Sequence, residues 1–410
     1  MENHKVIIVG GGPAGMMAAL TAAEENKKVV LIEKNPQLGK KLAITGGGRC
    51  NITNFSEADE MIKKIINNGR FLYSAFNALT SSELIKIIED LGVPVKIEAE
   101  NKVFPISDRS SDIIEAFYKR LKTLGVEFVF NKGVIEIMTE NSLVIGVRLE
   151  DGGIIKGNSV VLATGGVSYP TTGSTGDGYR FAEELGHALV DPKPALVPLV
   201  VKESWIKELM GISIGDAELS FKGSKKKPLT VRGPIIFTHF GLSGPAVLEL
   251  SSHLNQYIDK DVVNLKLDFL PELPEASLEQ ALIRPNDVVA NSSIKKFLNQ
   301  YLPKNLLQIL FSIEAIDGEV NLKENTKNDR QKLLKLLKNM ELTVISLKSL
   351  KEAIITSGGV SVKEINPKTM ESKLIKGLFF AGEIIDTDAV TGGYNLHIAF
   401  STGYLAGQNS

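Results

Sequence analysis

The chain has 410 residues, 43% hydrophobic and 23% charged, which is an ordinary composition for a globular protein of about two or three domains. Its 47 basic and 48 acidic side chains leave a net charge of −1, which argues against a general nucleic-acid-binding protein and against charge-driven attachment to membranes. The single cysteine excludes a disulfide framework or an all-cysteine metal site within one chain. We therefore expect a cytoplasmic protein with no nucleic-acid partner, no membrane association and no metal site.

The start of the chain alternates between strand-like and helix-like patterns. Lys5–Val9 is a β-branched run that predicts a buried strand, Pro13–Glu25 predicts a helix, and Val29–Glu33 predicts a second strand. This β-α-β order explains the uncharged stretch 6–23 better than a membrane span or a signal peptide. Glycines interrupt the stretch, and no basic segment typical of a signal peptide precedes it.

The turn between the first strand and helix has the spacing G-x-G-x-x-G, which is typical of dinucleotide binding in this context. Gly10 would make the tight turn, Gly12 would let the backbone approach a pyrophosphate, and Gly15 would allow close packing of helix and strand. The helix N-terminus would bind the phosphates, and Glu33 would accept hydrogen bonds from a ribose diol. The cofactor-binding candidates in this unit are Gly10, Gly12, Pro13, Ala14, Gly15, Glu33 and Lys34.

A second glycine-rich loop is predicted within residues 40–54. Arg49 would neutralise a pyrophosphate or a substrate carboxylate, or form a structural ion pair, and the sequence leaves these alternatives open. Cys50 would be reactive if Arg49 lowered its pKa, but a buried packing role is favoured, since no second cysteine exists to make a dithiol centre. The cofactor-binding candidates here are Lys41, Gly47, Gly48, Arg49, Cys50 and Asn51.

Helices and short strands alternate in the following segment. Amphipathic helices are predicted over Ser81–Leu91 and Ser110–Leu124, with the serines as N-caps. A three-stranded meander is then predicted over Gly133–Thr139, Leu143–Glu150 and Ile154–Lys156. Ser159–Ala163 predicts another buried strand, whose end carries the cofactor-binding candidates Ala163, Thr164 and Gly165.

The prolines of 191–198 predict a domain boundary. We expect an inserted substrate or cap domain over 192–345, with a β-barrel over about 192–265 and a helical part over about 270–345. Helical periodicity is clearest in Ser293–Leu302 and Asp329–Met340. His239 lies in a Gly/Ser/Pro-rich loop of this domain and is the candidate general acid–base residue, with a purely structural histidine as the alternative.

The end of the chain repeats the logic of its beginning. A buried strand ends at Gly382–Glu383, and a glycine pair opens a helix at about Tyr394. Residues 1–191 and 346–410 are therefore expected to form one discontinuous nucleotide-binding domain. The candidates here are Gly382, Glu383, Asp386, Gly393, Tyr394, Asn395 and Leu396.

FAD explains both ends of the chain better than NAD does. Only one full fingerprint follows a strand, and the chain lacks the cysteine pair of a disulfide reductase. The adenosine would lie by the first β-α-β unit, and the flavin would reach the terminal strand–helix junction. Asn395 and the backbone of 393–396 would stabilise negative charge on the reduced ring.

These motifs together carry a family resemblance. The chain resembles the YhiN/BaiN-type NAD(P)/FAD-dependent oxidoreductases, which are aminoacetone-oxidase-like flavoproteins. The resemblance rests on Gly10–Gly15, Glu33, Thr45–Asn51, Ala163–Gly166, Phe237–Pro245, Gly382–Asp386 and Gly392–Asn395. It implies an α/β fold with a glutathione-reductase-type, Rossmann-like FAD domain and an inserted β-barrel plus helical domain. It also implies that Val134 lies near the adenine.

The expected function is FAD-dependent oxidoreduction, passing hydride between the flavin N5 and a small organic substrate or NAD(P)H, the latter as a transient reductant. One alternative direction is reduction of an activated C=C bond, as in the bile-acid-type relatives. Another alternative is an amine or amino-acid oxidase using oxygen. A flavin-dependent RNA-modification protein is the alternative from a different class. A small-molecule substrate and a monomer or small homo-oligomer are expected.

Overall fold

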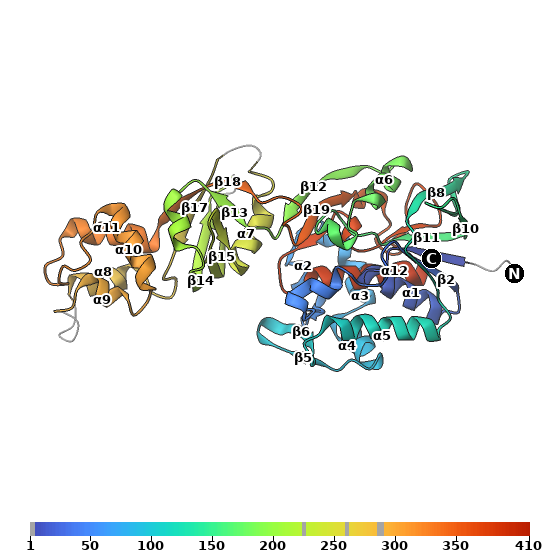
Figure 1. Cartoon of the computed structure of the whole chain (residues 1–410), viewed down its shortest axis with the longest axis horizontal. Helices are drawn as coiled ribbons and strands as arrows, with labels where there is room; N and C mark the ends of the chain where they lie inside the picture. Colours follow the sequence, from blue (N-terminus) through green and yellow to red (C-terminus); the bar gives the residue numbers. More distant parts are fainter. Residues whose placement is uncertain (1–4, 224–226, 259–261, 285–290) are drawn as a thin grey trace. The chain divides into compact units, whose positions relative to one another are not determined.

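A computed structural model describes residues 5–223, 227–258, 262–284 and 291–410. The chain divides into two units with separate hydrophobic cores: Met1–Pro194 with Leu350–Ser410, and Ala195–Ser349 (Figure 1). The boundaries expected at 191/192 and 345/346 lie close to these.

A parallel sheet forms the centre of the first unit. Its order is β20-β11-β1-β2-β7, with β1 at Lys5–Val9, β2 at Lys28–Glu33, β7 at Glu127–Phe130, β11 at Ser159–Leu162 and β20 at Leu378–Phe380. Every neighbouring pair runs parallel, so all the carboxyl ends meet at one edge. The C-terminal strand β20 therefore lies two strands from the N-terminal β1, which closes the discontinuous domain.

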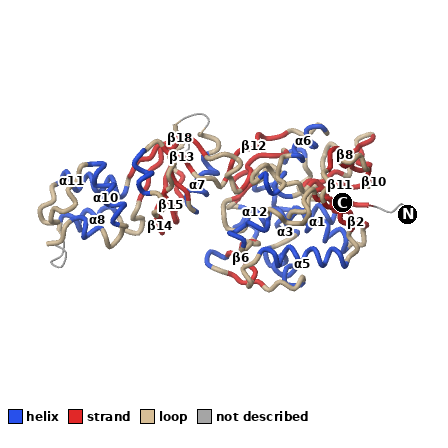
Figure 2. The backbone as a smooth tube through the Cα atoms, viewed as in Figure 1, coloured by secondary structure: helices blue, strands red, loops and turns tan. Residues whose placement is uncertain are grey.

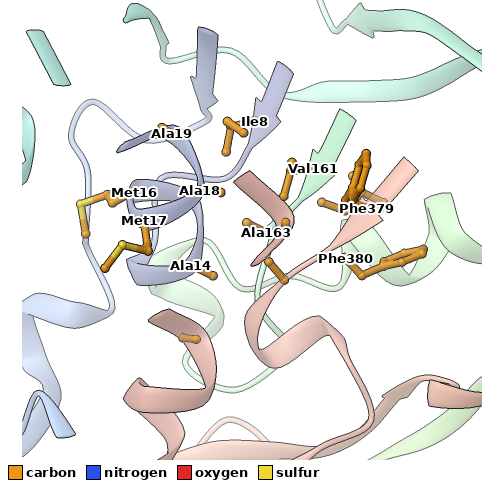
Figure 3. Packing of buried hydrophobic residues seen from close by; sticks show 14 of the residues in the cluster. Ile8, Ala14, Met16, Met17, Ala18, Ala19, Val161, Ala163, Phe379 and Phe380 are labelled. Atoms are coloured by element: carbon orange, nitrogen blue, oxygen red, sulfur yellow. The ribbon is translucent and has the colours of Figure 1, made fainter. Parts of the chain in front are cut away.

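Two helices of small residues pack against each other on this sheet: α1 (Pro13–Glu24) and α12 (Tyr394–Asn409). A Cβ atom added at Gly403 would lie 2.3 Å from the Ala14 carbonyl oxygen, and one at Gly407 would lie 2.4 Å from that of Ala18. Figure 3 shows the buried alanine and methionine side chains of α1 beside apolar side chains of β1, β11 and β20. The two helices can approach so closely because neither carries bulk at the contact.

Further elements complete the first unit. Its helices are α2 (Ala58–Ile62), α3 (Tyr73–Ala78), α4 (Ser81–Asp90), α5 (Ser110–Thr123) and α6 (Asp177–Glu184). Its short strands are β3 (Thr53–Asn54), β4 (Ile65–Asn67), β5 (Val95–Ile97), β6 (Lys102–Pro105), β12 (Leu189–Ala195), β19 (Ile355–Val360) and β21 (Asp388–Ala389). The predicted meander is confirmed as the antiparallel sheet β10-β9-β8, formed by β8 (Val134–Glu140), β9 (Leu143–Leu149) and β10 (Ile154–Lys156).

The serine caps expected for two helices are wrong. Thr80 caps α4, because its side chain accepts from the Glu83 N–H at 3.3 Å while the Glu83 carboxylate accepts from the Thr80 N–H at 2.8 Å. Ser81 instead donates to the Ser56 carbonyl. At α5 the hydroxyl of Ser110 donates to a distant carbonyl in place of capping. The sequence pattern placed each cap one residue late, inside the first turn.

The second unit is built on a closed barrel of order β13-β16-β15-β14-β17-β18. Its strands are β13 (Leu199–Val201), β14 (Ser213–Phe221), β15 (Leu229–Phe237), β16 (Gly241–Ser243), β17 (Val263–Asp268) and β18 (Met340–Leu347). Its helices are α7 (Pro245–Leu254), α8 (Glu275–Ile283), α9 (Ile294–Leu298), α10 (Lys304–Glu314) and α11 (Lys327–Lys338). Helices α8, α10 and α11 gather at one end of the barrel (Figure 2).

One boundary inside this unit differs from the expectation. The helical part was expected to reach about residue 345, but α11 ends at Lys338 and β18 follows, pairing with β17 and β13 to close the barrel. Buried and exposed residues alternate along the first part of β18, which is the period of a strand. Among the described residues, no helix has the length and apolarity that crossing a membrane requires.

Candidate functional site

The turn from β1 into α1 leaves room for a ligand. Gly10 has φ +106°, and a Cβ there would lie 2.4 Å from the Ala163 carbonyl oxygen, so only glycine fits. At Gly12, by contrast, an added Cβ would meet nothing within 4 Å. The first bond of α1 runs from the Met16 N–H to the Gly12 carbonyl, so the earlier amides have no partner within the helix. This end of α1 is suited to bind an anion.

The end of β2 holds the acid expected to bind a ribose. Glu33 accepts through Oε2 from the Gly11 N–H at 2.8 Å and through Oε1 from the Asn35 N–H at 2.8 Å. These bonds fix the carboxylate and leave lone pairs for further donors. Lys34 pairs with Asp177 at 2.6 Å. The Asn131 N–H donates to the Asn35 carbonyl at 3.3 Å, which brings the chain just before Val134 to this end of the sheet.

Arg49 is held by acids of its own unit. Its guanidinium donates to Asp108 at 2.6 and 2.8 Å and to Glu98 at 2.5 Å, and it lies over the Phe104 ring at 4.1 Å. Of the alternatives left open by the sequence, the structure shows the ion pair. A phosphate or a substrate carboxylate would have to compete with two carboxylates already in place.

The thiol of Cys50 is buried, and burial raises its pKa to about 12, although a hydrogen bond with Thr45 acts in the opposite direction. The structure therefore supports a packing role for Cys50 and not a reactive one. The glycines at 46–48 all have positive φ and form the expected exposed-backbone loop. Asn51 leaves this loop with its side-chain oxygen buried and without a hydrogen-bond partner among the described residues.

Lys41 forms an ion pair with Glu383, a residue near the C-terminal end of the sequence. Its ammonium lies 2.8 and 3.0 Å from the carboxylate of Glu383, which also accepts from Ser168 Oγ at 3.0 Å and from the Thr356 N–H at 2.8 Å. Burial by itself would raise the pKa of Glu383, but Lys41 and these hydrogen bonds outweigh it and lower the pKa overall. Gly165, at the end of β11, lies beside this pair.

The N-terminus of α12 begins at a glycine that no other residue could replace. Gly393 has φ +97°, and a Cβ there would lie 2.4 Å from the Thr53 carbonyl. The amide of Asn395 bonds to both backbone groups of Ala389, at 3.0 and 2.9 Å, so its side chain already has partners within the chain. Tyr394 is buried and Leu396 half-buried in the same turn.

The starts of α1 and α12 are offset along a shared direction. Gly403 touches Ala14 and Gly407 touches Ala18, so α1 and α12 run in the same direction at their contact. Tyr394 precedes Gly403 by nine residues and Pro13 precedes Ala14 by one, which places the start of α12 about 12 Å beyond the start of α1. An extended dinucleotide can therefore meet one helix N-terminus at its pyrophosphate and the other at its ring.

Buried polar atoms lie near both positions. Thr164, next to the Ala163 that touches Gly10, has its hydroxyl buried without a partner among the described residues. Asn51 Oδ1 is in the same state, two residues before the Thr53 that touches Gly393. Buried polar atoms of native proteins almost always have partners. The Thr164 hydroxyl packs against Gly178 of α6, so Asn51 is the buried group that a ligand could complete.

A family model described as HI0933-like protein Rossmann domain matches residues 4–409. The chain belongs to the HI0933-like family. The resemblance stated from the sequence is thereby confirmed, and so is the Rossmann-type FAD-binding fold with its inserted barrel and helices.

Curated relatives cover this HI0933-like chain almost completely. It is 29% identical over 414 residues to the ribosomal RNA dihydrouridine synthase of Escherichia coli strain K12, spanning 100% of this chain and 98% of the relative. It is also 29% identical over 382 residues to the 3-dehydro-bile acid delta(4,6)-reductase of Clostridium scindens, spanning 93% and 92%.

Solved structures agree on the fold. The 3-ketosteroid delta1-dehydrogenase of Sterolibacterium denitrificans matches with a TM-score of 0.51 at 14% identity, covering 99% of both chains. The 3-ketosteroid-delta4-(5alpha)-dehydrogenase of Rhodococcus jostii RHA1 matches with 0.50 at 15% identity, covering 99% of this chain and 97% of the other. Family and fold place the HI0933-like chain among FAD-dependent oxidoreductases.

His239 is the one site candidate in the second unit. It is exposed at the tip of the β15–β16 hairpin, where its ring packs edge-on against Phe240 at 4.9 Å.

Sequence reasoning missed four residues of the HI0933-like site. Ser168 and Thr356 bind Glu383, while Asn67 and Ser357 bind Asp388, a residue just beyond the predicted Asp386. The glycine pair that follows Ser357 in a buried strand was an available signal. Among the described residues, no group of three or more His, Cys, Asp or Glu side chains is placed to hold a metal ion.

Proposed function

We propose that this chain is an FAD-dependent reductase that saturates a C=C bond conjugated to a carbonyl group. The observation that best supports a dinucleotide cofactor is the start of α1, where Gly12 leaves open space and the first amides have no partner within the helix. The reaction class is supported by the relatives, because a dihydrouridine synthase and a delta(4,6)-reductase are both named for the saturation of such bonds.

Each end of the site has a distinct task in this proposal. The α1 N-terminus and Gly12 hold the pyrophosphate, Glu33 accepts hydrogen bonds from the ribose, and the α12 N-terminus stabilises negative charge at the ring. Bound FAD would supply the two-electron chemistry that side chains lack. His239 stays the candidate acid–base residue, as an exposed histidine on a hairpin of the inserted unit.

We propose NAD(P)H as the reductant of the flavin. The first experiment tests whether NADPH or NADH reduces the bound flavin. The purified protein is mixed anaerobically with NADPH and then with NADH, and the flavin absorbance is followed. Rapid bleaching supports the proposal. If neither nucleotide bleaches the flavin while amines or amino acids yield peroxide, the oxidase alternative replaces it.

Two variants test FAD binding without an activity assay. Gly12→Val would fill the open space at the α1 N-terminus, so the purified variant should lose FAD, while its melting temperature should equal that of the wild type stripped of FAD. Gly215→Val is the matched control, since a Cβ at Gly215 also meets nothing within 4 Å but lies in the second unit. Equal FAD content in both variants would contradict the placement of the pyrophosphate.

A uridine in ribosomal RNA is the second candidate substrate. The dihydrouridine synthase relative favours this substrate, because the match covers 98% of that relative's length. An RNA substrate would contradict our expectation of no nucleic-acid partner. Reduced protein is incubated with an unmodified ribosomal RNA transcript, or with a 3-oxo-delta4,6 steroid. Gain of two hydrogens by uridine or by the steroid, measured by mass spectrometry, decides between them. A cytoplasmic monomer or small homo-oligomer stays our prediction for the assembly.

A further inference from the structure

A buried acidic segment lies behind the start of α12. Asp386 and Asp388 flank Thr387, and all three residues are buried, Asp388 with 0% of its surface exposed. Asp388 Oδ1 accepts from Asn67 Nδ2 at 2.6 Å and from Ser357 Oγ at 3.1 Å. Its Oδ2 meets no hydrogen-bond donor among the described residues.

This environment favours the neutral acid. An ionised carboxylate requires donors on both oxygens, and here one oxygen is enclosed without any. Burial accordingly raises the pKa of Asp388 to about 6, against the opposing hydrogen bonds from Asn67 and Ser357, and the charge of Asp386 adds to the rise.

The groups that face Asp388 are few and mostly neutral. Asn67 comes from β4, Ser357 from β19, and the charged neighbour that acts on it is Asp386. Asp386 is itself buried and accepts from Asn68 Nδ2 at 2.8 Å, and burial raises its pKa as well. No cation is hydrogen-bonded to Asp388 among the described residues.

Asp388 is tied directly to the first turn of α12. The next residue, Ala389, exchanges two hydrogen bonds with the Asn395 amide in that turn. With no exposed surface, Asp388 cannot touch a ligand itself. A charge on it would still be felt at the helix N-terminus, because water does not screen it there.

We propose that Asp388 is a positioning residue whose enclosed carboxyl, with one oxygen lacking a donor among the described residues, gains and loses a proton and thereby sets the electron affinity of the site at the α12 N-terminus. The inference rests on the proposed function, which places the flavin ring at that terminus. The protonated acid leaves the positive end of the helix uncompensated and favours extra negative charge on the ring. The ionised acid opposes that charge.

The first test uses the protein without added FAD. Since the folded state raises the pKa of Asp388 from 3.8 to about 6, the stabilisation from this group is complete below about pH 4 and is lost as the pH rises through about 6. Relative to Asp388→Asn, the folding equilibrium constant of the wild type should fall about a hundredfold across that window. Asp90→Asn, an exposed change of equal charge at the end of α4, should show no such window.

The second test measures the potential of bound FAD against pH. As the pH falls through about 6, the potential of the wild type should rise more steeply than that of Asp388→Asn. Asn67→Ala keeps the acid but removes a donor to its charged form, so the steep region should move to higher pH. This variant decides the question if Asp388→Asn fails to fold.

The two tests separate the two proposals. A wild-type to Asp388→Asn difference in stability that does not change with pH would overturn the titration of Asp388. Superimposable potential profiles would overturn its coupling to the site. Failure of the wild type to bind FAD would overturn the proposed function, while the stability test would still report on the titration of Asp388.

Discussion

The basic side chains near the cofactor motifs differ in what they face. Arg49 is neutralised by Glu98 and Asp108, and its role in binding phosphate is not supported. Lys41 instead joins the loop after β2 to Glu383 after β20, with about a fifth of each side chain exposed. The ion pair thus connects segments from the two ends of the chain at the proposed cofactor site.

Lys41→Met tests this connection at the residue scale. At neutral pH we expect a loss of about 1–3 kcal/mol in unfolding free energy, less than for a fully buried pair because the site is partly exposed. The pH dependence should also reverse. In the wild type the lowered pKa of Glu383 gives stability that is lost as the pH falls, whereas burial without Lys41 would raise that pKa and remove stability as the pH rises.

Urea unfolding between pH 4 and pH 8 measures both effects. Lys40→Met is the matched control, because Lys40 is exposed and donates to the neutral amide oxygen of Asn35 at 3.3 Å. An equal loss in the two variants would show that the Glu383 pair contributes nothing specific.

At the scale of elements, helix starts decide where the site is placed. Thr80 closes α4 with a reciprocal capping box, and Gly393 opens α12 at the ring end of the proposed site. The start of α4 depends on the side chain of Thr80, whereas the start of α12 depends on the absence of a side chain at Gly393.

Thr80→Ala should lower the unfolding free energy by about 1 kcal/mol, because the Glu83 N–H loses its acceptor. Ser82→Ala, at an exposed position in the same first turn, should be neutral. Thermal unfolding compares the two. A larger loss in Ser82→Ala would contradict the assignment of the cap.

Gly393→Ala should cost more than Gly92→Ala, although both glycines have nearly the same φ, +97° and +92°. The shared backbone strain is about 1–2 kcal/mol. Only at position 393 does the new Cβ strike backbone atoms, at 2.4 Å from Thr53, whereas nothing lies within 4 Å at Gly92. FAD titration should show weaker binding in Gly393→Ala alone, and equal affinities in the two variants would oppose a cofactor at the α12 N-terminus.

At the scale of the whole molecule, two separate cores predict two unfolding events. Calorimetry of the intact chain should resolve them. Added FAD should stabilise only the first unit. At an FAD concentration a hundred times the dissociation constant, its unfolding free energy should rise by about 2.7 kcal/mol. A single transition that shifts as one body with FAD would show that the units unfold together.

Much of the first unit was predictable because its signals are local. The strand, glycine turn and helix of residues 5–24 depend on neighbours in sequence, and so does the meander after Gly133. The glycine-led helix at Tyr394 was found in the same way. The strand β18 was missed because the sequence pattern near Lys338 continues a leucine-rich helix, and its partners β17 and β13 lie far away along the chain.

The sequence by itself determined the family, the Rossmann-type unit at both ends of the chain and the glycines that open its two helices. These follow from short-range spacing and from the close approach that only glycine permits. Tertiary structure alone decided which acids Lys41 and Arg49 meet and that Asp388 is enclosed with one oxygen unpaired among the described residues. The physical reason is that burial and charge pairing depend on segments hundreds of residues apart, such as β4 and β21, which meet only in the folded chain.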